Sequence, residues 1–299
     1  MPERKSISSD VITRAYLDSL LMEGRHLDAV KPSTELELYG KTFRTPVMTA
    51  ALSHLHNTWP DGMAAMAQGA SQEGAVVWSG MGAKEELESM VATGASVIKI
   101  IKPYADRDSI RDKIAHAEEI GCLAVGIDID HAFDRRHGYD VIEDMPMFPM
   151  TTAEIAELVK STRLPFVIKG VLSRQDARKC LDAGVQGMVI SHHNGRLDCA
   201  VPPLMILPEI LEETQGKVPL FVDCSLESGL DVLKALALGA TACSIGRPLM
   251  RRLKEKGAEG VREGVAEITR DLAYCMAMTA SPDLKHIDRS IVRESHFSW

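Results

Sequence analysis

Short apolar stretches recur along most of the chain and are separated by longer segments of mixed character. The stretches are too short for helices, are rich in Val and Ile, and lack polar alternation, as is typical of strands buried on both faces of a parallel sheet. We therefore predict eight strands, at residues 46–50, 75–79, 96–101, 123–129, 165–169, 187–190, 219–223 and 241–245.

An amphipathic segment follows each predicted strand. Several of these segments end at a glycine, namely Gly74, Gly94, Gly121 and Gly184, which is a common helix stop. Eight consecutive βα units without a break predict a (β/α)8 TIM barrel, with an open doubly wound sheet as the alternative. The predicted helices are 61–73, 84–92, 107–120, 152–161, 174–182, 204–214, 229–238 and 259–278.

The chain shows no linker of biased composition, so we predict a single domain over residues 1–299. Residues 1–42 form an N-terminal extension with a helix at 10–23, and an extended pair or short hairpin is expected at 35–43. The barrel spans 43–280, and a C-terminal tail covers 281–299.

Composition argues against nucleic acid and membranes as partners of this protein. The net charge of -8 argues against binding to nucleic acid phosphates. No apolar run reaches the roughly 20 residues that span a bilayer, and the N-terminus has no apolar signal core. The six cysteines are scattered, as in a protein with reduced thiols. These features predict a cytoplasmic protein with no membrane partner.

The segment 185–206 carries the strongest chemical signal. A buried strand ends there in Ser191-His192-His193-Asn194-Gly195-Arg196. At the carboxyl end of a barrel strand, His193 can take a proton near neutral pH. The planar fork of Arg196 can bind a carboxylate. The alternative is a polar loop in which these side chains are only solvated.

Other predicted strands also end in ionisable groups, and the carboxyl ends of barrel strands carry the chemistry. The loops after strands seven and eight commonly bind phosphate, and the backbone N–H groups at 225–229 and 246–247 suit an anion. We therefore expect a phosphorylated cofactor over the barrel mouth. The strand-end residues are Ser79, Lys99, Lys102, Asp128, Asp130, Lys169, His193, Arg196, Asp223 and Arg247.

Several of these segments resemble the FMN-dependent α-hydroxy acid oxidases and dehydrogenases, a family that includes glycolate oxidase and lactate oxidase. The resemblance is strong from about residue 165 to 250 and continues back to residue 46. It rests on KGV at 169–171, SHHNGRLD at 191–198, LPEI at 207–210, Asp223, DVLKALALGA at 231–240 and IGRP at 245–248.

The resemblance implies FMN as cofactor, a small carboxylate as substrate and a homo-oligomer, a tetramer in this family. His193 is then the catalytic base, Arg196 binds the substrate carboxylate, Lys169 stabilises charge on the reduced flavin, and Asp223 pairs with His193. Arg136 is implied as a second carboxylate-binding residue. The implied cofactor-binding residues are Thr49, Ala50, Ala51, Ser79, Lys99, Asp128, Lys169, Ser225, Gly246 and Arg247.

The chain departs from the family at positions expected near the cofactor. Glu227 stands where the family has a phosphate-binding Arg, and a carboxylate there repels a phosphate. Lys99 replaces a Gln and Asp128 a Thr, so these two residues either form an ion pair or shape a different pocket. Ile101 replaces a substrate-binding Tyr, and His192 replaces an Asn.

Two other functions remain open at this point. One is an FMN-dependent barrel of another reaction class, such as an isomerase, although retention of His193 and Arg196 favours oxidation. The other is a barrel without FMN that binds a metabolite or a metal through His131, His192, His193, Asp128 and Asp130. No metal-binding spacing on a single element supports the metal, so we predict none.

Overall fold

The computed structural model describes residues 8–135 and 138–295 and is built around one sheet of eight strands. Neighbouring strands pair in parallel, in the order β4–β15–β14–β13–β12–β7–β6–β5. The predicted (β/α)8 barrel is confirmed. The strands are β4 (Val47–Thr49), β5 (Val77–Ser79), β6 (Val97–Ile101), β7 (Ala124–Asp128), β12 (Phe166–Val171), β13 (Gly187–Ile190), β14 (Leu220–Val222) and β15 (Ala242–Ile245).

The first and last strands of this order, β4 and β5, are joined around Thr49. The Thr49 amide donates to the Val76 carbonyl at 3.3 Å, and the Thr49 hydroxyl accepts from the Trp78 amide at 2.9 Å. Through these bonds the sheet curves into a nearly closed barrel. All eight strand ends therefore meet at one mouth.

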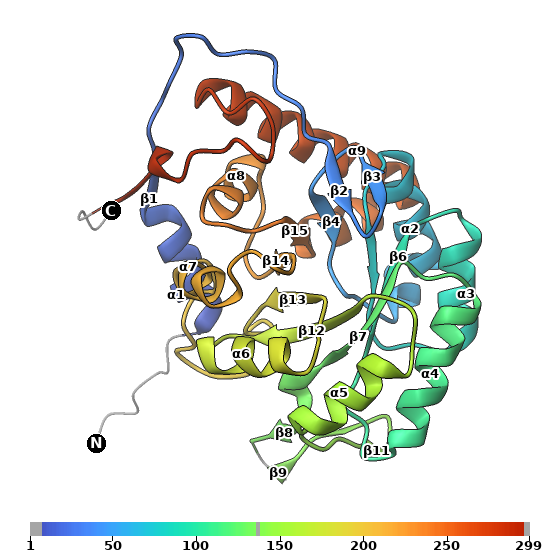
Figure 1. Ribbon diagram of the computed structural model, residues 1–299. Coiled ribbons are helices and arrows are strands. Elements are labelled where there is room, and N and C mark those ends of the chain that lie inside the picture. The colour runs from blue at the N-terminus through green and yellow to red at the C-terminus, as the bar shows by residue number, and fades with distance from the viewer. Residues whose placement is uncertain (1–7, 136–137, 296–299) are drawn as a thin grey trace, which may run out of the picture.

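Helices surround the strands (Figure 1). They are α2 (Gly62–Gln72), α3 (Lys84–Ala92), α4 (Arg107–Glu119), α5 (Thr152–Lys160), α6 (Arg174–Asp182), α7 (Pro203–Thr214), α8 (Gly229–Ala237) and α9 (Arg247–Met278). The predicted helix 259–278 corresponds to the part of α9 that follows a kink, and the prediction missed the helical part that begins directly after β15. Gly257, with φ 59° and ψ −140°, introduces a kink that separates this charged first part from the amphipathic second part.

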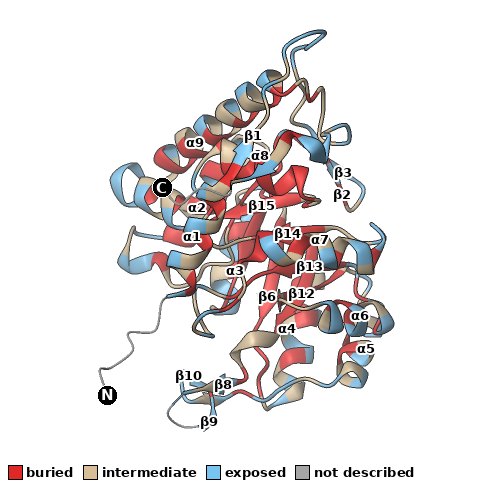
Figure 2. Cartoon of the chain, turned by 90° about the vertical axis from the view of Figure 1, so that its left-hand side faces the viewer, coloured by how far each residue is buried: buried red, intermediate tan, exposed pale blue. Residues whose placement is uncertain are grey.

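The barrel interior is filled by side chains. Trp78 and Phe221 meet edge to face, with ring centroids 5.2 Å apart. The predicted hairpin at 35–43 is present as β2 (Leu36–Leu38) and β3 (Lys41–Phe43), and its buried side chains join the same interior cluster. Figure 2 shows the strands as the most buried part of the chain. A filled interior leaves only the mouth for a ligand.

The N-terminal helix α1 (Ser9–Ser19) lies against α7 beside the barrel mouth (Figure 1). It is shorter than predicted because β1 (Leu20–Met22) pairs antiparallel with β16 (Val292–Glu294) near the C-terminus. Ser9 donates to the Leu197 carbonyl at 2.6 Å, so α1 contacts the loop after β13. Within the described residues, no helix combines the length and hydropathy that a bilayer-spanning segment requires.

Candidate active site at the barrel mouth

The loop after β13 turns sharply at His193. His193 and Asn194 have φ values of 48° and 57°, and Gly195 follows at 95°. A non-glycine residue in this left-handed region costs about 1–2 kcal/mol. The His193 amide donates to Ser191 Oγ at 3.0 Å and so holds the turn. As a result, the His193 side chain lines the mouth, whereas His192 is buried against Thr13 of α1, 2.8 Å from its hydroxyl.

Two aspartates from the end of β7 hold the His193 ring. Nδ1 of His193 lies 2.8 Å from Asp130 Oδ1 and 3.3 Å from Asp128 Oδ2. The expected pairing of His193 with Asp223 is therefore wrong: Asp223 instead lies 3.7 Å from Lys169 Nζ. Sequence reasoning placed Asp130 at a strand end but did not assign it this role.

Gly170 makes the approach of Asp130 possible. It sits at an irregularity in β12 with φ 97°, and a Cβ at this position would lie 2.7 Å from Asp130 Oδ2. Any larger residue would push the carboxylate away from the barrel mouth. The glycine of the KGV motif is thus explained by the aspartate packed against it.

The charges around His193 favour its protonated form. Burial and the Lys169 ammonium group disfavour a charged imidazole, but Asp128 and Asp130 outweigh them and raise the pKa of His193. Through Asp130 and Asp128, the site therefore stabilises the imidazolium that forms when His193 accepts a proton.

A buried cluster of charges lies beneath His193. Asp128 is only 2% exposed, with Lys102 Nζ at 2.7 Å and Lys169 Nζ at 3.9 Å. Burial opposes the charge on Asp128, but Lys169, His193 and Lys102 lower its pKa well below the usual range. Burial also opposes the charge on Lys169, yet Asp128 and Asp223 raise its pKa. Lys169 is consequently a permanent cation at the mouth.

Lys99 does not form the ion pair with Asp128 that was one of the two expectations for these residues. Its ammonium group donates to Ser79 Oγ at 3.3 Å and to the Gly80 carbonyl. Burial lowers the pKa of Lys99 to about 8. The partner of Asp128 is Lys102, which lies three residues after Lys99, directly beyond the end of β6.

Arg196 lies at the outer edge of the mouth. Its Nη2 donates to Asp140 Oδ2 at 2.6 Å and to the Phe133 carbonyl at 2.5 Å. Asp140 also contacts His131, whose other ring nitrogen faces His193. Arg136, the second predicted carboxylate-binding residue, lies outside the described residues.

Two cavities open at the mouth and share Ala51 and His193. One, of about 270 Å³, is lined by the predicted residues Ala50, Ala51, Lys169, His193, Asp223, Ser225, Gly246 and Arg247. The other, of about 280 Å³, includes Asp128, Lys102 and His131 in its lining. Among the described residues, Thr49, Ser79 and Lys99 are buried beside these cavities without lining either.

Helix α1 contacts the end of the first cavity at which the FMN phosphate is expected. Arg247 Nη1 donates to Asp10 Oδ2 at 3.2 Å, and Arg247 Nη2 lies 3.4 Å from Ser225 Oγ. Asp10 also accepts from Ser225 at 3.4 Å. Nothing in the local sequence of α1 signalled this contact, because it depends on how the helix crosses the barrel mouth.

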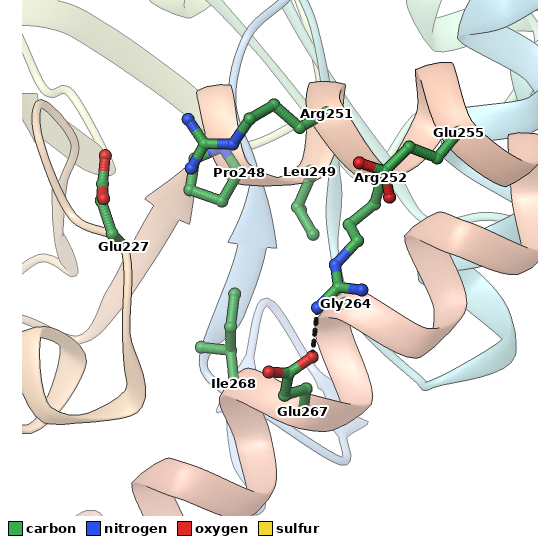
Figure 3. A pocket seen from close by; sticks show the side chains of 9 residues that line it. All are labelled: Glu227, Pro248, Leu249, Arg251, Arg252, Glu255, Gly264, Glu267 and Ile268. Atoms are coloured by element: carbon green, nitrogen blue, oxygen red, sulfur yellow. Dashed lines mark hydrogen bonds and ion pairs between the residues drawn. The ribbon is translucent and has the colours of Figure 1, made fainter.

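Glu227 lines the first cavity and also a neighbouring cavity of about 350 Å³. Figure 3 shows Glu227 on the wall opposite the ion pair between Arg252 and Glu267. Glu227 and Arg247 thus line the same cavity, and the Asp10 carboxylate pairs with Arg247 at 3.2 Å. The phosphate end carries less net positive charge than Arg247 alone would give it.

The residues of the first cavity suit FMN. Lys169 supplies a cation at one end, while Ser225, Arg247 and the start of α9 supply donors at the other. Gly246 keeps the wall open, since a Cβ there would meet the Ala50 side chain at 3.3 Å. The donor set is appropriate for the cofactor, although Asp10 and Glu227 oppose its phosphate.

The same mouth contains a cluster with metal-ligand chemistry. Ligand atoms of Asp128, Asp130, His131 and His193 lie within 4.8 Å of one another. However, the ammonium groups of Lys102 and Lys169 already balance the two carboxylates, so a divalent cation would add uncompensated charge. The arrangement favours proton handling over metal binding.

Comparisons with known proteins agree with this geometry. Residues 11–153 and 144–294 match the family model described as FMN-dependent dehydrogenase. The chain is 31% identical to 4-hydroxymandelate oxidase of Amycolatopsis orientalis, with 92% of the chain and 88% of the relative covered. It is 28% identical to human 2-hydroxyacid oxidase 2, with 96% and 92% covered. Mandelate oxidase solved with (S)-2-phenylpropionate superimposes with a TM-score of 0.87 at 30% identity, covering 96% of this chain and 89% of that one.

Proposed function

Because the chain belongs to the FMN-dependent dehydrogenase family, we propose that it oxidises a small α-hydroxy acid to the 2-oxo acid at the barrel mouth. The observation that carries this proposal is the His193 ring, held by Asp130 at 2.8 Å with Lys169 beside it at 3.1 Å. This arrangement joins a proton acceptor to a buried cation, which are the two groups that the reaction needs. The FMN-dependent isomerase alternative is less favoured, because His193 and Arg196 are both retained.

His193 takes the proton of the substrate hydroxyl in this proposal. The O–H bond breaks, and an N–H bond forms at Nε2, since Nδ1 faces Asp130. Asp130 and Asp128 stabilise the resulting imidazolium. Arg196 binds the substrate carboxylate and so orients the hydroxyl toward His193.

FMN, when bound, supplies the acceptor for the α-hydrogen and its two electrons. Ser225, Gly246 and Arg247 would hold the phosphate, and Ala50 and Ala51 line the same cavity, where they would contact the ring. Lys169 stabilises negative charge that develops near it, because Asp128 and Asp223 keep it protonated. In the proposal, four buried residues support the FMN site from the barrel interior, namely Thr49, Ser79, Lys99 and Asp128.

Two measurements test the proposed function. Purified protein, supplied with FMN, should show flavin absorbance, and this absorbance should bleach anaerobically on addition of lactate, glycolate or mandelate. The same treatment with the matching 2-oxo acids should leave the absorbance unbleached. A flavin that stays oxidised with every 2-hydroxy acid tried would reject the proposal.

A cytoplasmic location and a homo-oligomeric assembly complete the proposal. Five cysteines are free thiols, which supports a reducing compartment; they are Cys122, Cys180, Cys224, Cys243 and Cys275. The family resemblance supports a tetramer. Cell fractionation with an antibody against the chain, and light scattering on a size-exclusion column, test these two points.

A further inference from the structure

One short segment of the chain contacts both side chains to which the proposed function assigns the substrate, His193 and Arg196. This segment follows β7 and contains His131 and Asp140. His131 Nε2 lies 3.2 Å from His193 Nε2, with the two rings edge to face and their centroids 4.3 Å apart. Asp140 Oδ2 lies 2.6 Å from Arg196 Nη2. A carboxylate thus faces the expected carboxylate site, and a hydrogen-bonding ring faces the expected base.

The two residues are also joined to each other. His131 Nδ1 lies 3.2 Å from Asp140 Oδ2, so it carries the hydrogen and donates it to the carboxylate. The other nitrogen of His131 then presents a lone pair to His193. Burial and the nearby Lys102 lower the pKa of His131 to about 3, so this ring is neutral.

His193 must therefore donate from Nε2 to His131. Its Nδ1 lies 2.8 Å from Asp130 Oδ1 and 3.1 Å from Lys169 Nζ. The carboxylate is the nearer partner, so Nδ1 donates to Asp130, and with both nitrogens protonated His193 is an imidazolium. An imidazolium cannot take a proton from a substrate. As long as the contact with His131 stands, the proposed base is in its conjugate-acid form and its reactive nitrogen is covered.

The segment that carries this pair lies at the surface and is built from very short strands. It consists of two-residue strands, β8 (Phe133–Asp134) with β9 (Gly138–Tyr139) and β10 (Val141–Ile142) with β11 (Met145–Pro146). Phe133 and Val141 are each 57% exposed. Much of its apolar surface is thus exposed, and a surface segment of this kind opens at a lower free-energy cost than the barrel strands do. Asp140 itself is 9% exposed, so its contact with Arg196 is well shielded from water.

We propose that His131 and Asp140 form an internal competitor for the substrate, so that a 2-hydroxy or 2-oxo carboxylate binds by displacing this pair from His193 and Arg196. The inference rests on the proposed function, because that function assigns Arg196 and His193 to the substrate. The incoming carboxylate takes the place of Asp140 on Arg196. Loss of Asp140 frees His131 and uncovers His193 Nε2. Occupation of the site by its own chain thus lowers the apparent affinity for every carboxylate ligand.

The test measures binding of two unreactive carboxylates, oxalate and pyruvate, to the FMN-loaded protein by titration calorimetry. Asp140→Asn removes the competing charge with little change of shape and should tighten both ligands about tenfold. Asp144→Asn is the matched control, because Asp144 is an exposed carboxylate on the same segment whose φ of 61° suits asparagine. This control should bind like the parent.

A second variant keeps the proposal testable if Asp140→Asn fails to fold. His131→Phe keeps a ring of similar size but removes the acceptor, so it should tighten both ligands and lower the pKa of His193, measured by NMR. Parent protein that binds oxalate while Asp140→Asn and His131→Phe bind it equally or more weakly would overturn the internal competitor and leave the proposed function standing. If the parent and both variants all bind neither carboxylate, the proposed function is overturned, and this inference with it.

Discussion

Asp130 Oδ1 lies 2.8 Å from His193 Nδ1, and this contact joins the loop after β7 to the loop after β13 across the barrel mouth. It keeps the hydrogen of the ring on Nδ1 and leaves Nε2 for the substrate side. Because Asp130 accepts that hydrogen, it also stabilises the positive charge that appears when Nε2 is protonated. The tautomer and the basicity of His193 therefore depend on Asp130, with Asp128 at 3.3 Å as the second carboxylate that raises the pKa of His193.

Asp130→Asn should lower turnover about 10²-fold or more, since an amide neither fixes the tautomer nor stabilises the imidazolium. It should also lower the pKa of His193, because Asp130 is one of the groups that raise it. Turnover measured across pH checks both effects. An unaltered rate and pH profile would show that Asp130 does not act on His193.

His193→Ala should lower turnover by roughly 10²–10⁴-fold while flavin content stays near that of the parent. The matched control is His192→Asn. His192 contacts Thr13 of α1 at 2.8 Å and does not line the described cavities. The control should keep turnover within a few fold. Equal losses in both variants would indicate a structural defect in the loop rather than loss of a base.

Arg196→Lys keeps the charge but loses the planar fork. We expect a rise in KM for α-hydroxy acids of about tenfold or more, because a bidentate contact with the carboxylate is no longer possible. The ion pair with Asp140 weakens at the same time. Steady-state kinetics with several acids measure the effect, and an unchanged KM for all of them would remove Arg196 from substrate binding.

Asp10→Asn and Glu227→Arg should each tighten FMN binding about tenfold or more. Two unit charges 4 Å apart interact by about 1 kcal/mol in bulk water and by about 4 kcal/mol near a protein surface. Removing a carboxylate near the expected phosphate site therefore removes a substantial repulsion. Quenching of FMN fluorescence on addition to apo-protein measures the affinity. Asp18→Asn, on the same helix, is the control and should leave it unchanged.

These two variants also separate two roles for the carboxylates. If either one binds FMN more weakly than the parent, that carboxylate positions Arg247 for the phosphate instead of opposing it. The contact at 3.2 Å between Asp10 and Arg247 makes this outcome informative for α1 in particular.

Lys102→Met should destabilise the fold by about 3 kcal/mol, because it leaves Asp128 buried without its nearest cation. This value is at the lower end of the range for breaking a buried ion pair, since Lys169 remains 3.9 Å from Asp128. Urea unfolding at pH 7 measures the loss. Lys160→Met, at an exposed position of α5, is the control and should change stability little.

Acid should remove part of the same stabilisation in the parent protein. The pKa of Asp128 is lowered in the folded state, so its contribution is complete above about pH 4, the ordinary pKa of an aspartate, and is lost as pH falls through the folded-state value. Urea unfolding at pH 7 and at pH 3 measures this loss. An Asp128→Asn variant should show a smaller decrease between the two pH values than the parent does.

The barrel and the position of its mouth could be predicted from the sequence. Strands buried on both faces leave apolar runs such as the one before Ser191, and the segments between them have helical periodicity. Parallel strands place all their carboxyl ends at one edge, so the gathering of Lys169, His193 and Asp128 followed from their strand-end positions alone. The start of α9 could not be placed, because the charged residues before Gly257 lack a clear apolar face.

The partners of these residues were decided only by the tertiary structure. The sequence does not distinguish Asp130 from Asp223 as the partner of His193, since both follow strands. The left-handed turn at His193 and the space beside Gly170 select Asp130. Asp10 and Asp140 carry no local signal, because they come from α1 and from the segment after β7. They reach Arg247 and Arg196 only once the chain has folded. Ion pairing depends on distances of a few ångströms between side chains remote in sequence, and hydrophobic periodicity does not encode those distances.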